Sequence, residues 1–140
     1  NGRIKHFALT VRNLEMESEF YQKVFGLKFL GYDNQPMGSA IYLTDGTTNL
    51  ALIHPNKPDS EIKPGANHCG FQVGDLKAIE DRINNAGGAF FFDFGDEKHG
   101  NFERKFKDHD GVVFDVSKHG WVGTESYIAK KDEKTLAAAK

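Results

Sequence analysis

One stretch of the chain is repeated, and this repeat constrains the fold more than any other feature. Residues 6–14 read HFALTVRNL and residues 68–76 read HCGFQVGDL, so both fit His-x4-Val-x-(Asn/Asp)-Leu. The two copies begin at His6 and His68, which are 68 − 6 = 62 residues apart. An internal repeat indicates similar structural units that pack on each other. Because both copies begin with a histidine, we expect two half-sites that face one another.

Each half of the chain shows the same order of strand and helix patterns. Asn13 and Asp75 are suited to cap two helices, and Gly26 and Gly87 are suited to end them. The inward stripe predicted for the first helix is Leu14, Phe20, Tyr21 and Val24. The predicted helices cover 14–25 and the segment between Asp75 and Gly87. The predicted strands are 3–11, 27–33, 39–44, 48–54, 67–73, 89–94, 101–107 and 112–117.

This order predicts an α+β fold made of two tandem βαβββ modules. The first module covers about 3–54, a Pro-rich linker covers 55–65, and the second module covers about 66–118. Each module alone would leave one face of its sheet bare, and pairing the modules closes that face into a cup-shaped mixed sheet. We expect one domain over 1–140 with a C-terminal tail over 119–140, the end of which forms a mobile or weakly helical appendage.

Composition narrows the class of partner. A chain of 140 residues with 39% hydrophobic residues is large enough for one buried core. The formal charge of −2 gives no electrostatic basis for binding nucleic acid or an anionic membrane. A single cysteine favours a reducing, cytoplasmic setting, and no apolar run reaches the roughly 18 residues of a membrane span. A small-molecule substrate is therefore the expected partner.

Strand alternation directs three metal-competent side chains into the predicted cup. His6, His68 and Asp115 each lie opposite the apolar, helix-facing residues of their own strands. Two imidazoles and one carboxylate form the donor set that suits non-haem Fe(II) and leaves coordination positions open. The sequence therefore predicts a metal site formed by these three residues.

A metal-free interpretation of the same residues stays open. A histidine in a strand is often a hydrogen-bonded structural residue. An ionised carboxylate within an apolar strand costs on the order of several kcal/mol to bury unless a cation or metal pairs with it. Arg104 or Lys105, on the neighbouring predicted strand, could supply that cation to Asp115.

Four further residues are candidates for proton transfer beside a metal. They are Gln72, Tyr42, His99 and Glu103. Gln72 shares the inward side of its strand with His68. His99 lies in a loop, where a solvated surface histidine is the simpler interpretation. Glu103 is interpreted either as a surface residue on a strand or as an acid/base group.

Over about residues 3 to 120 the chain resembles the vicinal oxygen chelate superfamily, which includes glyoxalase I, extradiol dioxygenases, methylmalonyl-CoA epimerase, fosfomycin-resistance proteins and bleomycin-binding proteins. The resemblance rests on four motifs: residues 4–14 (IKHFALTVRNL), 20–27 (FYQKVFGL), 67–76 (NHCGFQVGDL) and 108–115 (DHDGVVFD). It implies the glyoxalase/dioxygenase-like fold and metal-ligand positions at His6, Ala51, His68 and Asp115.

Three departures from the family pattern bear on the reaction. Ala51 stands where glyoxalase I-like members have a glutamate, which matches the vacant position of extradiol dioxygenases and fosfomycin-modifying enzymes. Thr10 stands where bacterial glyoxalase I has a glutathione-binding arginine. Asp115 stands where relatives commonly have Glu, so the metal would lie deeper or be held less well.

The resemblance implies a divalent-metal enzyme with Fe(II) preferred, Mn(II) next, and Zn(II) or Ni(II) as further options. A ring-cleaving, extradiol-type dioxygenase is the first expectation, because three protein ligands leave room for a bidentate substrate and dioxygen. Two alternatives stay open: a metal-dependent lyase, isomerase or thiol transferase that uses no oxygen, and a metal-free binding protein of the bleomycin-resistance type. Family members often dimerise, so a homodimer is also expected.

Overall fold

The structure is a computed structural model that describes residues 1–95 and 102–129. Within these residues, two helices and eight strands follow one another as β-α-β-β-β twice, with a short 3-10 turn at Asp59–Glu61 between the repeats. The first repeat comprises β1 (Gly2–Thr10), α1 (Leu14–Phe25), β2 (Lys28–Gln35), β3 (Gly38–Thr44) and β4 (Asn49–Pro55). The second comprises β5 (Gly65–Val73), α2 (Leu76–Asn85), β6 (Ala89–Phe94), β7 (Glu103–Lys107) and β8 (Val113–Ser117).

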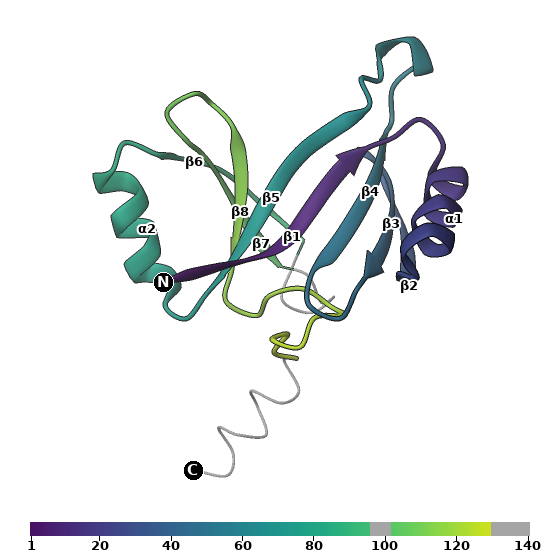
Figure 1. Cartoon of the computed structure of the whole chain (residues 1–140). Coiled ribbons are helices and arrows are strands. Elements are labelled where there is room, and N and C mark those ends of the chain that lie inside the picture. The colour runs from purple at the N-terminus through teal and green to yellow at the C-terminus, as the bar shows by residue number, and fades with distance from the viewer. Residues whose placement is uncertain (96–101, 130–140) are drawn as a thin grey trace.

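All eight strands form one mixed sheet with the order β2-β3-β4-β1-β5-β8-β7-β6. Each repeat pairs its first and last strands in parallel, as β1 with β4 and β5 with β8. The antiparallel pair β1–β5 joins the two repeats at the centre of the sheet. Figure 1 shows this open, curved sheet with α1 and α2 at its two ends. The α+β fold with two βαβββ repeats is therefore confirmed.

The helix ends follow from local chemistry. Asn13 accepts a hydrogen bond from the Met16 amide at the start of α1, and Asp75 does the same for the Ala78 amide at the start of α2. Gly26 ends α1 in the left-handed conformation with φ 67°, which favours glycine. These caps agree with the sequence prediction.

Each helix covers a small core of its own. Leu14 and Tyr21 of α1 pack against buried residues of β3 and β4, including Leu43 and Leu52. The second core is formed by Val73, Phe106 and Val116, against which Leu76, Ile79 and Ile83 of α2 pack. In the described part of the chain, no helix has the length and apolar character needed to cross a bilayer.

The predicted inward stripe of α1 is partly wrong. Phe20 and Val24 are 51% and 54% exposed, whereas Ser18 is buried. At 3.6 residues per turn, positions 14, 18 and 21 share one face, and positions 20 and 24 lie on another.

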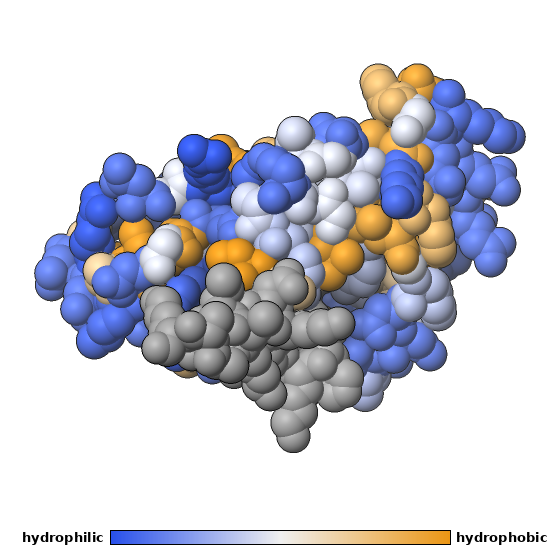
Figure 2. All heavy atoms as spheres, turned by 90° about the horizontal axis from the view of Figure 1, so that it is seen from below, coloured by the Kyte–Doolittle hydropathy of each residue, from blue (hydrophilic) through white to orange (hydrophobic). Residues whose placement is uncertain are grey.

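Figure 2, which views the molecule from below, shows mostly hydrophilic residues at the ends of the molecule and apolar residues in patches between them.

The first part of the tail, up to residue 129, is folded, which the sequence pattern did not indicate. Residues 118–129 fold back across one end of the sheet, and Trp121 in this segment is fully buried. The turn depends on Gly120 and Gly123, with φ 78° and 88°. The rest of the predicted tail, 130–140, lies outside the described residues.

Candidate metal centre

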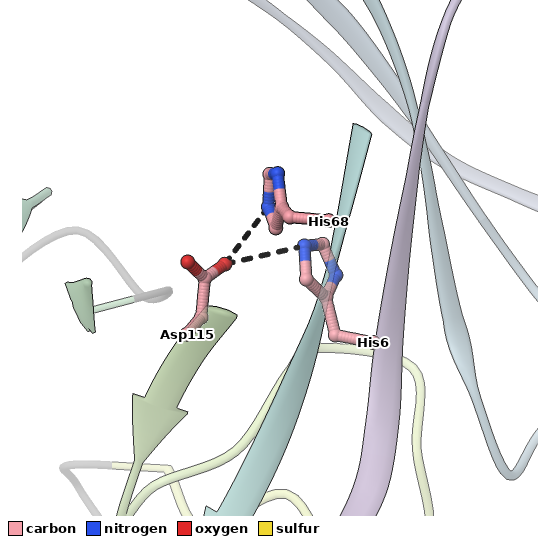
Figure 3. A group of neighbouring side chains, drawn as sticks. All are labelled: His6, His68 and Asp115. Carbon is pink, nitrogen blue, oxygen red and sulfur yellow. Dashed lines mark ion pairs between the residues drawn. The ribbon is translucent and has the colours of Figure 1, made fainter. Parts of the chain in front are cut away.

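The structure brings His6, His68 and Asp115 together at the middle of the sheet (Figure 3). They lie on β1, β5 and β8, which are neighbours in the sheet. Asp115 Oδ2 is 2.9 Å from His68 Nε2 and 3.7 Å from His6 Nε2. One donor atom from each residue lies within 4.8 Å of the other two. The convergence predicted from strand alternation is therefore present, and the binding of a metal there stays a prediction.

Two asparagines fix which ring nitrogens face the cluster. His6 Nδ1 is 2.8 Å from Asn49 Oδ1, and His68 Nδ1 is 2.6 Å from Asn67 Oδ1. An amide oxygen only accepts, so each Nδ1 must carry the proton and donate. In the neutral ring the other nitrogen then bears a lone pair. In that neutral form both Nε2 atoms are acceptors, the form in which a histidine binds metal.

Two buried atoms in the cluster have no hydrogen-bond partner among the described residues. They are His68 Nε2 and Asp115 Oδ2, which lie 2.9 Å apart. A neutral imidazole lone pair and a carboxylate oxygen at this distance repel each other unless a cation lies between them or the ring is protonated. An unpaired buried acceptor costs about 1–3 kcal/mol. A divalent metal would satisfy both atoms, so the donor set fits such an ion.

The protonation states of His6 and Asp115 also suit a metal. Burial lowers the pKa of His6 to about 4, so its ring is neutral at pH 7. Burial alone would raise the pKa of Asp115, but the neighbouring His68 and the positive charge of Lys105 bring it to about 2. Metal ligands must be neutral imidazole and ionised carboxylate, and these two residues have those forms at neutral pH.

Lys105 is a second neighbour of Asp115. Its Nζ lies 2.6 Å from Asp115 Oδ1, because the two residues are paired in the β7–β8 register. Arg104 binds Asp93 at 2.8 Å and also Glu80 of α2, so it faces the other side of the sheet. Of the two cations considered in the sequence, Lys105 is the one that reaches Asp115. It engages one oxygen and leaves the other toward the histidines.

A cavity of about 690 Å³ opens over the cluster. Its walls are largely apolar and include the aromatic rings of Phe91, Phe92 and Phe94. Ala51, at the position where the family resemblance implies a fourth ligand, also lines this cavity. The lining residues include several with ionisable side chains, namely His6, Asp33, Tyr42, His68, Glu103 and Lys105.

Glu103 is buried, so its interpretation as a surface residue is wrong. It is 5% exposed, because alternation on β7 turns Glu103 and Lys105 into the cup together. Its Oε1 accepts a hydrogen bond of 2.7 Å from Trp121 Nε1, and its Oε2 lies 3.5 Å from Lys105 Nζ. Burial and the charge of Asp115 raise the pKa of Glu103 to about 8. A carboxyl group of this kind can hold a proton near neutral pH.

The other three candidates differ in position. Tyr42 lines the cavity, and burial raises its pKa to about 12, so its hydroxyl stays a donor. Gln72 is not among the cavity-lining residues and binds Ser126 instead, with Nε2 2.7 Å from the backbone oxygen. A catalytic role for Gln72 therefore has no geometrical basis. His99 lies outside the described residues.

Sequence reasoning missed Asn49 and Trp121. Asn49 shares the inward side of β4 with Ala51, so strand alternation could have identified it. Trp121 stacks on His6, with ring centroids 4.9 Å apart and planes 1° apart. It follows the last strand, where no periodic pattern assigns a side chain to the cup. The only available signal was that the one tryptophan of the chain lies in a Gly-rich segment.

The sequence matches one family. The model of the Glyoxalase/Bleomycin resistance protein/Dioxygenase superfamily matches residues 3–116. A lactoylglutathione lyase of Neisseria meningitidis serogroup A is 31% identical over 117 residues, which cover 78% of this chain and 85% of the relative. An ethylmalonyl-CoA/methylmalonyl-CoA epimerase of Cereibacter sphaeroides is 28% identical over 96 residues, covering 61% of this chain and 72% of that protein.

Solved structures share the fold at lower identity. A variant of Streptomyces coelicolor methylmalonyl-CoA epimerase, in complex with 2-nitronate-propionyl-CoA, superposes with a TM-score of 0.67 and 18% identity, covering 81% of this chain and 94% of that one. A hypothetical protein of Bacillus halodurans gives a TM-score of 0.68 with 16% identity, covering 83% of this chain and 93% of that one. At such identities the likeness establishes the fold alone.

Proposed function

Because the chain belongs to the Glyoxalase/Bleomycin resistance protein/Dioxygenase superfamily, we propose that it is a metal-dependent enzyme that acts on a small molecule. His6, His68 and Asp115 would hold one divalent ion. The observation that supports this most strongly is the pair of buried acceptors, His68 Nε2 and Asp115 Oδ2, which lie 2.9 Å apart with no hydrogen-bond partner among the described residues.

The proposed ion is Fe(II), with Mn(II) next and Zn(II) or Ni(II) after them. Two imidazoles and one carboxylate are the set that suits non-haem Fe(II). When bound, a divalent ion would supply Lewis-acid chemistry toward two adjacent oxygens of a substrate. The side chain of Ala51 offers no fourth ligand, so positions stay open for those oxygens.

The proposed reaction is proton transfer at a carbon next to a carbonyl group, the chemistry of a lyase, isomerase or epimerase. The relatives with the highest identities reported above are a lyase and an epimerase by name, which changes the order of preference reached from the sequence. Glu103 is the proposed acid/base group, since it lines the cavity and its pKa of about 8 lets it both take and return a proton. Tyr42 would donate a hydrogen bond to the substrate.

A ring-cleaving dioxygenase is the second candidate, favoured by two features of the site. Because Ala51 offers no fourth ligand, the three remaining ligands leave room on the ion for a bidentate substrate together with dioxygen. The cavity also has aromatic walls. A metal-free binding protein is the third candidate. It is favoured by Lys105, whose ammonium group lies 2.6 Å from Asp115 Oδ1 and neutralises part of its charge.

Titration with Co(II) tests the metal site directly. Trp121 is the only tryptophan of the chain and stacks on His6, so its fluorescence reports an ion at that ring. We expect saturable quenching at one equivalent. In His6→Ala and His68→Ala, affinity should fall by more than the roughly 10–100-fold that loss of an outer-shell partner costs. His109→Ala is the matched control, since that ring binds the Ala86 oxygen outside the cavity. Equal Co(II) affinity in all four proteins would contradict the ligand assignment.

The reaction class is tested on the metal-loaded protein. Exchange of substrate carbon-bound hydrogen with deuterated water should occur with thiohemiacetals or acyl thioesters. Glu103→Gln should slow this exchange by about 10²–10⁴-fold while Co(II) affinity changes little. Oxygen uptake with a panel of catechols under Fe(II), without deuterium exchange, would favour the dioxygenase instead.

A further inference from the structure

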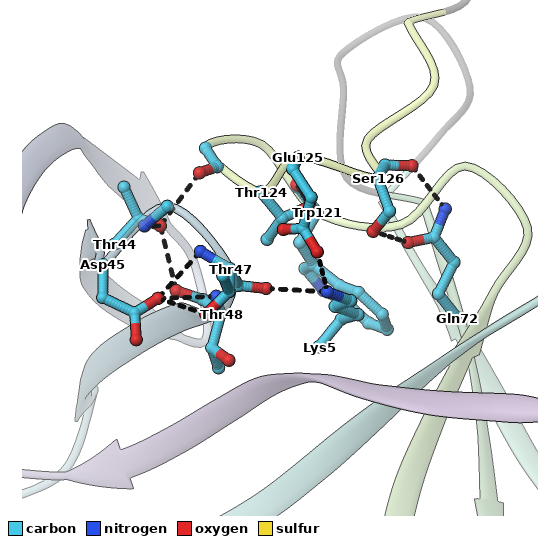
Figure 4. A network of polar contacts seen from close by, with 12 residues as sticks. Lys5, Thr44, Asp45, Thr47, Thr48, Gln72, Trp121, Thr124, Glu125 and Ser126 are labelled. Atoms are coloured by element: carbon cyan, nitrogen blue, oxygen red, sulfur yellow. Dashed lines mark hydrogen bonds and ion pairs between the residues drawn. The ribbon is translucent and has the colours of Figure 1, made fainter.

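Residues 118–129, named here the strap, cross one end of the sheet after β8 (Figure 4). The strap is tied to the first repeat through the β3–β4 turn: Thr44 Oγ1 donates to the Gly123 oxygen at 2.9 Å, and the Glu125 amide donates to the Gly46 oxygen at 3.0 Å. It is tied to the second repeat through Gln72, whose Nε2 donates to the Ser126 oxygen at 2.7 Å. Both halves of the cup therefore hold the strap.

A buried cation adds to these ties. Lys5 on β1 is 6% exposed and forms an ion pair with Glu125 of the strap. It also donates to the Thr47 oxygen of the β3–β4 turn at 3.2 Å. A register shift on β1 between Ile4 and His6 turns the neighbouring residues Lys5 and His6 into the buried region together. The strap thus docks beside the predicted metal ligand.

Trp121 connects the strap to the cluster. Its indole is fully buried and stacks on the His6 ring at a centroid distance of 4.9 Å, with the planes 1° apart. Its Nε1 donates a hydrogen bond of 2.7 Å to Glu103. One side chain therefore contacts both a predicted ligand and the proposed acid/base group.

Gly70 provides the space for this indole. It lies opposite His6 in the β1–β5 register. A Cβ at this position would come 2.6 Å from Trp121 Cζ2 and 3.1 Å from His6 Cβ. The first distance is shorter than any normal contact, so a larger residue would displace the indole. The glycine here serves close packing of the ring.

The strap also reaches His6 by a second route. The Val122 backbone oxygen accepts a hydrogen bond of 3.1 Å from Asn49 Nδ2. Asn49 Oδ1 in turn accepts from His6 Nδ1 at 2.8 Å. The His6 ring is therefore held at its face by Trp121 and at its edge by Asn49. Rotation of an imidazole about its last side-chain bond has only broad minima, so these two contacts define the direction of Nε2.

We propose that Trp121 is a positioning residue of the metal centre. It fixes the plane of the His6 ring so that Nε2 points toward Asp115, and it holds Glu103 at the edge of the cavity. Trp121 is not among the residues that line the cavity, so it would touch neither metal nor substrate. Ligand geometry must be held within about 0.5 Å and 10–20° for a site to function, and a stacked, fully buried indole provides that constraint. This inference rests on the proposed function, because it assumes that His6 binds the ion.

The test compares Co(II) binding by the parent protein, Trp121→Leu and Trp121→Phe, followed by calorimetry and by the visible absorption of Co(II). In Trp121→Leu we expect affinity to fall about 10–100-fold and the Co(II) bands to change, because His6 is free to turn. Trp121→Phe keeps a flat ring, so the Co(II) spectrum and most of the affinity should be restored. Ile128→Ala, a strap substitution at a 38% exposed side chain, is the control and should match the parent.

Gly70→Ala is a second variant, which keeps the indole but displaces it from its place beside His6, and it should weaken Co(II) binding in the same direction. Thermal unfolding of every variant checks that each protein is folded. Affinity and spectrum equal to the parent in Trp121→Leu and Gly70→Ala would overturn the positioning role and leave the proposed function standing. No Co(II) binding by the parent would overturn the proposed function, and the positioning role with it.

Discussion

Asp115 presents each of its two oxygens to a different partner. Oδ1 accepts from Lys105 at 2.6 Å, and Oδ2 lies 2.9 Å from His68 Nε2 and 3.7 Å from His6 Nε2. The carboxylate is fully buried, so its charge must be compensated inside the protein. With both imidazole rings neutral, Lys105 alone leaves Oδ2 facing two nitrogen lone pairs. A divalent ion on the side of the histidines would complete the compensation, and both cations can act on Asp115 at once.

Replacing Lys105 separates its compensation of the Asp115 charge from that of a divalent ion. In Lys105→Met, the metal-free protein should be less stable by about 3–5 kcal/mol, because a buried carboxylate loses its partner. A divalent ion should then raise the melting temperature more in the variant than in the parent, since it becomes the only strong compensation for Asp115. Calorimetric unfolding with and without Co(II) measures this. An equal shift in both proteins would indicate that the ion does not contact Asp115.

At the scale of elements, the β3–β4 turn supports both the sheet and the strap. Asp45 Oδ1 accepts hydrogen bonds from the Thr48 amide at 2.8 Å and the Thr47 amide at 2.9 Å. These two backbone hydrogen bonds lower the pKa of Asp45, and the one from Thr48 has the larger effect. Gly46 in the same turn accepts from the strap amide of Glu125. The hydrogen bonds of Asp45 that stabilise this turn therefore also help to hold the strap, which lies more than 70 residues further along the chain.

Asp45→Ala tests this turn through its pH dependence. The folded pKa of Asp45 lies below its unfolded value of about 4, so the stabilisation is present above that value and is lost as pH falls through the folded pKa. At pH 7 the variant should be less stable by about 1 kcal/mol. The difference from the parent should shrink below pH 4. Urea unfolding at pH 7 and pH 3 measures both values, and a difference independent of pH would contradict the assignment.

The elements were predictable because their signals are local. Alternation with a period of two identified the inward side of β1, β5 and β8, and with it His6, His68 and Asp115. Trp121 was not predictable, because its contact with His6 joins residues 121 − 6 = 115 positions apart through an irregular segment. Phe20 was assigned to the wrong face, since apolar residues occur on two sides of α1 and periodicity alone does not choose between them.

At the scale of the whole molecule, the candidate site joins two halves that otherwise have separate cores. The buried clusters under α1 and α2 contain no residue in common, and the halves meet along β1 and β5. His6 comes from the first repeat, whereas His68 and Asp115 come from the second. An ion at this position would therefore link both halves. The homodimer expected from the sequence stays a prediction, to be measured by light scattering in solution.

Metal binding should consequently stabilise the entire fold. An ion that binds only the folded state contributes about 2.7 kcal/mol at 100 times its dissociation constant. Because the ligands span both repeats, we expect a single unfolding transition that moves upward as a whole. Two transitions, with only one moving, would indicate that the ion binds one half. Differential scanning calorimetry over a Co(II) series distinguishes the two outcomes.

The central claim is that His6, His68 and Asp115 share one ion. Crystals grown with Fe(II) under anaerobic conditions, measured on both sides of the iron absorption edge, test it most directly. We predict one anomalous peak about 2.0–2.3 Å from His6 Nε2, His68 Nε2 and Asp115 Oδ2. An electron-density map without such a peak, in which His68 and Lys105 alone contact Asp115, would contradict the account.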